Sequence, residues 1–340
     1  MRYTVSMSTT EIITARPLAQ DEAVEESLRP LRLSDYIGQT VARENITVLV
    51  ESSKIRQILP DHLLLHGPPG LGKTTLAHIV ARELEVPIRS TSGPALERSG
   101  DVVALVTSLP ANSILFIDEI HRLRRALEEI LYSAMEDGHV DVVMGKGPTA
   151  KSLQLPLQPF MLIGATTKIG SLSAPLRDRF GTHLHLDFYS TDELTTIAAK
   201  TAQQLKLDIL PEALRYLAER SRKTPRIVNR LLRRVRDYAI AEKHTAPIDL
   251  ALVKKVLTMQ TIDDNGLTKQ DRRYLHYLIN SNPGKPTGLT TLAAALSEEL
   301  DTITDVIEPY LLQEGYIQRT PQGRIATPRA YGSDNSLPLS

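Results

Sequence analysis

Residues 67–74 constrain the fold more than any other stretch of this 340-residue chain. They read Gly-Pro-Pro-Gly-Leu-Gly-Lys-Thr, which matches the P-loop pattern G-x-x-x-x-G-K-[ST] in full. A predicted strand at residues 63–66, which begins with three leucines, precedes the motif, and a helical pattern at residues 74–84 follows it. A strand, a glycine-rich turn and a helix in this order form a cradle for phosphates, because backbone N–H groups and the helix N-terminus face the anion. A chance glycine-rich turn would not carry all three features with the Lys-Thr pair.

The P-loop assigns roles to two side chains. Lys73 is predicted to reach the β- and γ-phosphates of a nucleotide, and the Thr74 hydroxyl to ligate Mg²⁺. A second apolar run, residues 114–117, ends in Asp118 and Glu119. Asp118 would help to hold the magnesium, and Glu119 would polarise the attacking water. A strand ending in Asp-Glu is common by itself, so this interpretation depends on the P-loop upstream.

Three further polar positions are candidates for the same site. Thr166 and Thr167 end the apolar run 160–165, where a hydroxyl is placed to bond the γ-phosphate or the attacking water, although strand capping explains it equally well. Arg179, in Arg-Asp-Arg-Phe, is a candidate for completing a neighbouring subunit's site. Arg226, in Thr-Pro-Arg, opens a helix of the next domain and is placed to report nucleotide state. Each arginine by itself would more often be a solvated surface charge.

Sequence pattern divides the chain into four parts. Residues 1–27 form a polar, acidic tail that we expect to be disordered. Residues 28–189 alternate apolar runs with helical stretches such as 125–135, which predicts an α/β doubly wound parallel sheet of the P-loop class. Residues 190–260 predict a small all-helical domain, with helices at 192–205, 211–220 and 225–241.

Residues 261–340 form the last predicted domain. Helical patterns cover 269–280, 289–297 and 301–314, and strand-like segments 316–319 and 324–327 flank a Thr-Pro-Gln-Gly turn. Three helices followed by a hairpin are typical of a winged helix-turn-helix. A generic helical domain with a terminal hairpin has the same pattern.

Composition excludes several classes of site. The chain has no cysteine, which excludes disulfide frameworks, cysteine zinc sites and cysteine nucleophiles. No apolar run reaches the ~18 residues of a membrane span, and the first twenty residues contain no secretory apolar region.

The 40 basic and 40 acidic side chains give a net charge of zero, which argues at first against a nucleic-acid partner. Their distribution overturns that argument. Nine basic residues between Arg215 and Arg236 stand against Glu219, and residues 315–332 carry three arginines and no acid.

Together these motifs resemble AAA+ ATPases. Within that class the chain resembles the RuvB family, the bacterial Holliday-junction branch-migration motors, over residues 28–330. The segments that carry the resemblance are 28–30, 35–39, 67–75, 91–94, 118–123, 164–167, 175–181, 224–227, 229–237, 308–311 and 318–321.

The resemblance implies a large AAA+ domain, a helical lid and a winged-helix head, with ATP and Mg²⁺ between the large domain and the lid. The implied catalytic residues are Lys73, Asp118, Glu119, Thr167 as sensor 1 and Arg179 as the finger. The implied nucleotide-binding residues are Leu28, Arg29, Tyr36, Ile37, Gly70, Gly72, Lys73, Thr74, Thr75, Glu136, Asp137, Arg179, Tyr189, Pro225 and Arg226, the last as sensor 2. Thr74 and Asp118 are the implied metal ligands, and Arg319 and Arg324 the implied DNA contacts.

The family's activity is ATP-driven branch migration of Holliday junctions in homologous recombination and DNA repair, by hexameric rings that translocate duplex DNA. The resemblance therefore implies that the chain associates with itself and binds the duplex DNA arms of the junction. It also implies that RuvA docks on a hairpin at residues 140–157 and that RuvC joins in the resolvase complex. The implied location is the bacterial cytoplasm, in association with the nucleoid and not with a membrane. The hairpin segment is equally compatible with a plain surface hairpin. Two positions depart from the family. Position 138 is usually aromatic in the family and is a glycine here, and Leu300 stands where a DNA-contacting arginine can occur.

Two other classes of AAA+ protein share parts of this pattern. A transcriptional activator with a winged-helix DNA reader would carry a Gly-Ala-Phe-Thr-Gly-Ala loop, which the chain lacks. A clamp-loader subunit would commonly carry a cysteine zinc module and a Ser-Arg-Cys finger, where this chain has no cysteine and Arg-Asp-Arg-Phe. ATP-driven dissociation of a four-way junction distinguishes the three.

Overall fold

The computed structural model describes residues 28–144, 151–281 and 283–332. The tail predicted at residues 1–27 and the Gly/Pro turn at residues 145–148 lie outside these ranges. The chain divides into two compact units, one spanning Pro30–Asp187 and the other holding Phe188–Ser340 with the residues before Pro30.

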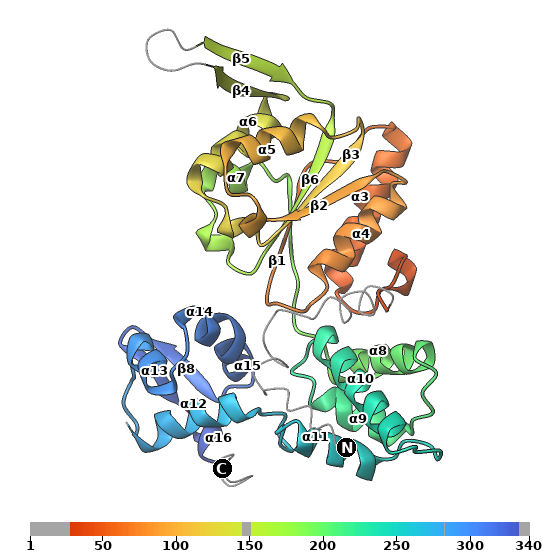
Figure 1. Ribbon diagram of the computed structural model, residues 1–340, viewed down its shortest axis with the longest axis vertical. Helices are drawn as coiled ribbons and strands as arrows, with labels where there is room; N and C mark the ends of the chain where they lie inside the picture. The colour runs from red at the N-terminus through yellow and green to blue at the C-terminus, as the bar shows by residue number, and fades with distance from the viewer. Residues whose placement is uncertain (1–27, 145–150, 282, 333–340) are drawn as a thin grey trace, which may run out of the picture. The chain divides into compact units, whose positions relative to one another are not determined.

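The Pro30–Asp187 unit is built on a five-stranded sheet of order β2-β3-β6-β1-β7, in which every neighbouring pair is parallel (Figure 1). Its strands are β1 (Leu63–His66), β2 (Ile88–Ser92), β3 (Ser113–Asp118), β6 (Phe160–Thr166) and β7 (Thr182–His185). The predicted α/β doubly wound parallel sheet is confirmed. The three central strands coincide with the three predicted apolar runs, because both of their faces are buried.

Helices cover both faces of this sheet (Figure 1). They are α3 (Thr40–Arg56), α4 (Lys73–Glu83), α5 (Ser99–Thr107), α6 (Arg125–Glu136) and α7 (Ala174–Asp178), with short 3₁₀ turns at Leu33–Asp35, Gly93–Ala95, Ile120–Arg122 and Ile169–Ser171. Leu64, Leu115 and Leu162 pack in one core with α5, α6 and α7. Phe116 alternates to the other face, where its ring lies 6.3 Å from that of His78 on α4.

A hairpin follows α6 in the same unit. Strands β4 (His139–Met144) and β5 (Lys151–Pro156) pair antiparallel over the segment where a hairpin was expected. Val140 is buried and joins the core beneath α5 and α6, whereas Leu153 is 48% exposed. The hairpin is therefore anchored at its base and presents apolar surface farther along.

The second unit contains the lid and the head. The lid consists of α8 (Thr191–Gln204), α9 (Pro211–Glu219), α10 (Pro225–Ala241) and α11 (Leu250–Met259), of which α11 was not predicted. The head consists of α12 (Lys269–Asn280), α13 (Leu289–Leu296), α14 (Leu300–Thr302), α15 (Glu308–Gln313), β8 (Ile317–Thr320), β9 (Gly323–Ala326) and α16 (Pro328–Tyr331). The predicted third helix of the head is interrupted by a π-helical turn, Ile303–Ile307.

The head has its own core, in which Tyr274, Leu292, Ile303 and Leu311 pack under the β8–β9 wing. The fold therefore agrees with the predicted winged helix. The domain boundaries at residues 189 and 260 remain predictions, since lid and head share one compact unit. Within the described ranges, no helix has the length and apolar character needed to cross a membrane.

Candidate functional site

The P-loop joins β1 to α4 at the carboxyl edge of the sheet. Helix α4 begins at Lys73, directly after Gly72, whose φ of 99° is a backbone conformation that glycine adopts readily. A Cβ atom at Gly72 would lie 2.5 Å from the hydroxyl oxygen of Tyr36. That hydroxyl donates to the carbonyl of Leu71 at 3.2 Å. Tyr36 is therefore packed against the P-loop and braces it.

Lys73 points into this loop. Its side chain is buried, and its Nζ donates to the carbonyl oxygens of Gly67 at 2.8 Å and Pro68 at 2.9 Å. Burying an ammonium is costly unless acceptors surround it. A buried cation ringed by loop backbone fits the phosphates of a nucleotide, which offer the same kind of oxygen acceptor.

Two side-chain oxygens that could bind a metal ion meet beside the loop. The Thr74 hydroxyl on α4 donates to Oδ2 of Asp118 at the end of β3, over 3.0 Å, and Oδ1 accepts the Glu119 N–H. A hydroxyl and a carboxylate suit Mg²⁺, which takes few protein ligands and completes its shell with water and substrate phosphates. In the described part of the chain, no cluster of three or more His, Cys, Asp or Glu side chains could hold a metal ion.

A polar chain extends from Glu119. Its carboxylate Oε2 lies 3.4 Å from Nε2 of His121, and Nδ1 of His121 lies 2.9 Å from Oγ1 of Thr166. Thr166 is fully buried and its Oγ1 also accepts the Lys168 N–H at 3.0 Å, so its hydroxyl caps the strand end. Thr167, half-buried at the next position, stays the sensor candidate. Sequence reasoning gave no role to His121, although it stands in the Asp-Glu-Ile-His segment.

The predicted finger, Arg179, is the C-cap residue directly after α7. It forms an ion pair with Glu136 of α6, and its guanidinium carbon lies 5.2 Å from the ring centroid of Tyr132, a residue that sequence reasoning missed. The Tyr132 hydroxyl and the Glu136 carboxylate raise the pKa of Arg179 above its usual value. One of the two predicted acidic residues and the predicted finger thus form a single cluster.

This cluster lies at the amino-terminal ends of the strands, opposite the carboxyl ends, where the P-loop lies. Arg179 lines a cleft of about 320 Å³ with His62, Phe160 and Gly181, which stand at the amino-terminal starts of β1, β6 and β7. The strands are parallel, so their carboxyl ends all lie at the opposite end of the sheet. Lys73 lies at that end, because the P-loop follows the carboxyl end of β1. Four residues of β1 span about 13 Å. Arg179 therefore faces away from the P-loop of its own chain.

The remaining predicted residues divide between the two units. Gly70 has a φ of 80° within the P-loop, Thr75 and Ile37 are half-buried, and Asp137 is exposed after α6. The predicted nucleotide-binding residues outside the P-loop unit are Leu28, Arg29, Tyr189, Pro225 and Arg226.

Three of these residues lie beside the loop before α10. Tyr189 is buried, and its N–H donates to the carbonyl of Lys223 at 3.1 Å. Pro225 opens α10, and the half-buried Arg226 follows it.

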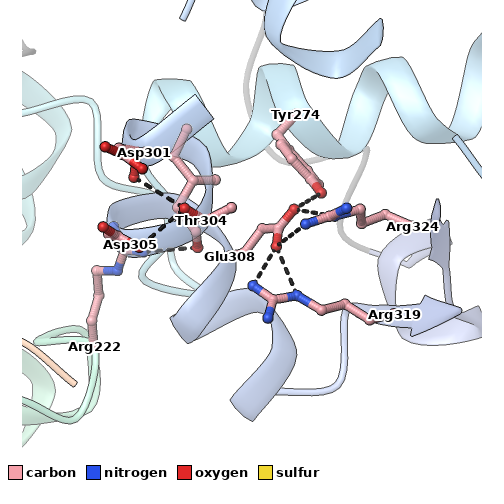
Figure 2. Close-up of polar contacts among 9 residues, drawn as sticks. Arg222, Tyr274, Asp301, Thr304, Asp305, Glu308, Arg319 and Arg324 are labelled. Carbon is pink, nitrogen blue, oxygen red and sulfur yellow. Dashed lines mark hydrogen bonds and ion pairs between the residues drawn. The ribbon is translucent and has the colours of Figure 1, made fainter. Parts of the chain in front are cut away.

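Both predicted DNA contacts bind one buried carboxylate in the head (Figure 2). Arg319 donates to Oε2 of Glu308 at 2.6 and 2.9 Å, and Arg324 donates to Oε1 at 2.7 Å. The hydroxyl of Tyr274 donates to Oε1 at 2.9 Å. Arg319 keeps 49% of its side chain exposed, whereas Arg324 keeps 16%. Arg324 is thus part of the head's interior, and Arg319 is the arginine that faces solvent.

The basic segment between Arg215 and Arg236 is less of a surface feature than its sequence indicated. Arg222 and Arg233 are buried, and Arg220 pairs with Glu219 at 3.0 Å. Of the two departures from the family, Gly138 has a φ of 64° with open space around it, and Leu300 is 44% exposed at the start of α14.

Comparisons with known proteins agree on all three parts of the chain. Residues 28–186 match the model of the RuvB Holliday junction DNA helicase P-loop domain. Residues 189–263 match the RuvB AAA lid domain, and residues 264–333 match the RuvB C-terminal winged helix domain.

Solved structures give the same answer. The structure is similar to that of Thermotoga maritima RuvB, described as a Holliday junction branch migration motor, with 47% identity, coverage of 90% of this chain and 97% of that one, and a TM-score of 0.82. An alanine-to-serine variant of the same protein matches with 47% identity, the same coverages and a TM-score of 0.84.

Proposed function

The chain belongs to the RuvB family of Holliday junction branch-migration motors, and from that premise we propose how its own residues hydrolyse ATP and move DNA. The reaction is ATP + H₂O → ADP + phosphate. Lys73 neutralises the phosphates, and Glu119 accepts a proton from the attacking water, with His121 and Thr166 holding its carboxylate in place. Thr167 orients the γ-phosphate or the water. Thr74 and Asp118 hold Mg²⁺, which supplies further positive charge.

The site is completed by a second copy of the chain. The observation that carries this step is the placement of Arg179 and Lys73 at opposite edges of one sheet. A finger on the far edge can stabilise transition-state charge only in a neighbour, and repetition of that contact closes a ring. Six copies are the number that the family resemblance implies. Glu136 and Tyr132 hold Arg179 until a neighbour's nucleotide arrives.

The ring pulls duplex DNA while other proteins hold the junction. Arg319 contacts the phosphate backbone from the wing, and Arg226 couples nucleotide state to the lid. The β4–β5 hairpin docks RuvA, for which the exposed Leu153 offers apolar surface. RuvC joins the resolvase complex, and the protein acts at the bacterial nucleoid in the cytoplasm. Base pairs lost and gained nearly balance, so ATP mainly gives direction.

A synthetic four-way junction tests this function directly. The chain is expected to dissociate the junction only with ATP, Mg²⁺ and RuvA present, and a Glu119→Gln variant is expected to bind ATP without turnover. A junction left intact by the parent chain, under conditions in which another RuvB family member dissociates it, would contradict the proposal. Hydrolysis without any dissociation would favour the clamp-loader alternative.

A further inference from the structure

The loop between α9 and α10, residues 220–224, has two consecutive non-glycine residues in the left-handed backbone region. Arg222 has a φ of 54° and Lys223 a φ of 56°. A non-glycine residue in this region is strained and persists where surrounding contacts hold it. Both side chains make those contacts in the head rather than in the lid.

Arg222 reaches from the lid into the π-helical turn of the head (Figure 2). Its Nη2 donates to the carbonyl of Val306 at 3.0 Å and lies 3.4 Å from Oδ1 of the fully buried Asp271. Its guanidinium carbon stands 4.9 Å from the ring centroid of Tyr310. A π-helical turn displaces the regular hydrogen-bond ladder, which leaves carbonyl groups able to accept a donor from outside.

Lys223 makes the second connection. Its Nζ lies 2.6 Å from Oε1 of Glu314, a half-buried carboxylate just beyond α15. The carbonyl of Lys223 in turn accepts the N–H of Tyr189. This loop therefore contacts Tyr189, which is predicted to approach the nucleotide. It also contacts Glu314, which directly follows α15, the helix that begins with Glu308.

We propose that Arg222 and Lys223 form a latch that makes the lid and head move as one body, so that nucleotide-driven motion of the lid reaches Arg319. Arg226 lies four residues after Arg222, and Glu308, which holds Arg319, follows directly after the turn that Arg222 contacts. The latch rests on the proposed function. Both residues are positioning residues, since neither touches the reacting atoms.

The left-handed backbone supplies a variant that keeps the fold. Lys223→Gly removes the ion pair while relieving the strain, so stability should hold or rise. Lys243→Gly is the matched control, because Lys243 has a φ of 53° and stands exposed at the far end of α10. Arg222→Lys keeps the charge but loses the planar fork.

The measurement is the number of junctions dissociated per ATP hydrolysed by the full chain with RuvA. Lys223→Gly is expected to lower this ratio about two- to fivefold, as for loss of a partly exposed ion pair, with ATP turnover nearly unchanged. Arg222→Lys/Lys223→Gly is expected to lower it about tenfold or more. Lys243→Gly should match the parent. An unchanged ratio in the double variant, or an equal fall in turnover and dissociation, would overturn the latch.

The absence of cysteine allows a rescue experiment. Lys223→Cys/Glu314→Cys is expected to show the reduced ratio, and a flexible bis-maleimide that joins the two thiols should restore it. Failure of the cross-linked protein to recover would also overturn the proposal. The parent chain's own dissociation of the junction separately decides whether the proposed function holds.

Discussion

Removing the Glu308 carboxylate is expected to open the head without disturbing the ATPase domain. Glu308 is fully buried and accepts hydrogen bonds from Tyr274, Arg319 and Arg324. In Glu308→Ala, Arg319 can turn to solvent because half of its side chain is already exposed. Arg324, which is only 16% exposed, and the buried Tyr274 have less freedom to turn outward, so one largely buried cation and one buried hydroxyl lose their acceptor.

Breaking a buried ion pair from one side costs about 3–5 kcal/mol, because the partner's charge remains desolvated. Glu219→Ala is the matched control. Glu219 also pairs with two arginines, Arg215 and Arg220, but its own side chain is 43% exposed. Exposed pairs contribute about 0–1 kcal/mol, so this variant should change little.

Amide hydrogen exchange followed by mass spectrometry separates the effect by domain. Where closing is faster than exchange, 3–5 kcal/mol corresponds to roughly 150-fold to several thousandfold faster exchange in peptides of α12, β8 and β9. The control should change exchange in α9 by about fivefold at most. Exchange in the head that rises no more than in the control would refute the argument that the buried carboxylate holds the wing. Glu308→Met/Arg324→Met, which removes both charges, should recover much of the loss.

Three further predictions follow from the geometry. Arg179→Ala should bind nucleotide but lose turnover by about 10³-fold or more, and mixing it with Lys73→Ala should restore some hydrolysis; assembled mixed rings without recovery would contradict a shared site. Burial holds the pKa of His62 below its usual 6.5, and its Nδ1 must stay unprotonated to accept the Leu162 N–H. The unfolded chain therefore takes up the proton first, so this contribution to stability is complete above about pH 6.5 and is lost below it. The temperature midpoint of unfolding should therefore decrease as the pH is lowered from about 7 to 5, and it should decrease less in His62→Asn. Arg319→Ala should weaken DNA binding equally across sequences and lower the salt slope by about one, whereas sequence-selective loss would contradict a phosphate contact.

Local signals predicted the parts of the molecule that lie within one motif. The P-loop, the Asp-Glu strand end and the central strands are contiguous in sequence, and burial on both faces makes the strands apolar throughout. The edge strands β2, Ile-Arg-Ser-Thr-Ser, and β7, Thr-His-Leu-His, were missed because they are half-exposed and mostly polar. A resemblance supplied the roles of the two wing arginines, but only the fold reveals that Arg324 faces inward.

Pairings across long sequence separations lay beyond the sequence altogether. Arg222 and Val306 stand 84 residues apart, and Arg179 and Tyr132 stand 47 apart. Counting charges along the segment 215–236 could not separate the buried Arg222 and Arg233 from exposed neighbours. The sequence therefore supplied candidates for the chemistry of the site, whereas the connections that would transmit motion required the packed structure.

Glu308 offsets part of the positive charge of the wing. Arg319 and Arg324 contribute two positive charges and Glu308 one negative charge, so the cluster carries +1 rather than +2. A phosphate that approaches Arg319 competes with a carboxylate that the protein already provides. Each neutralised phosphate contributes about 0.9 to the salt slope, so a wing of this kind should contribute nearer to ~0.9 than to ~1.8. A phosphate contact weakened in this way suits a motor, because each step must break the DNA contact that the previous step made.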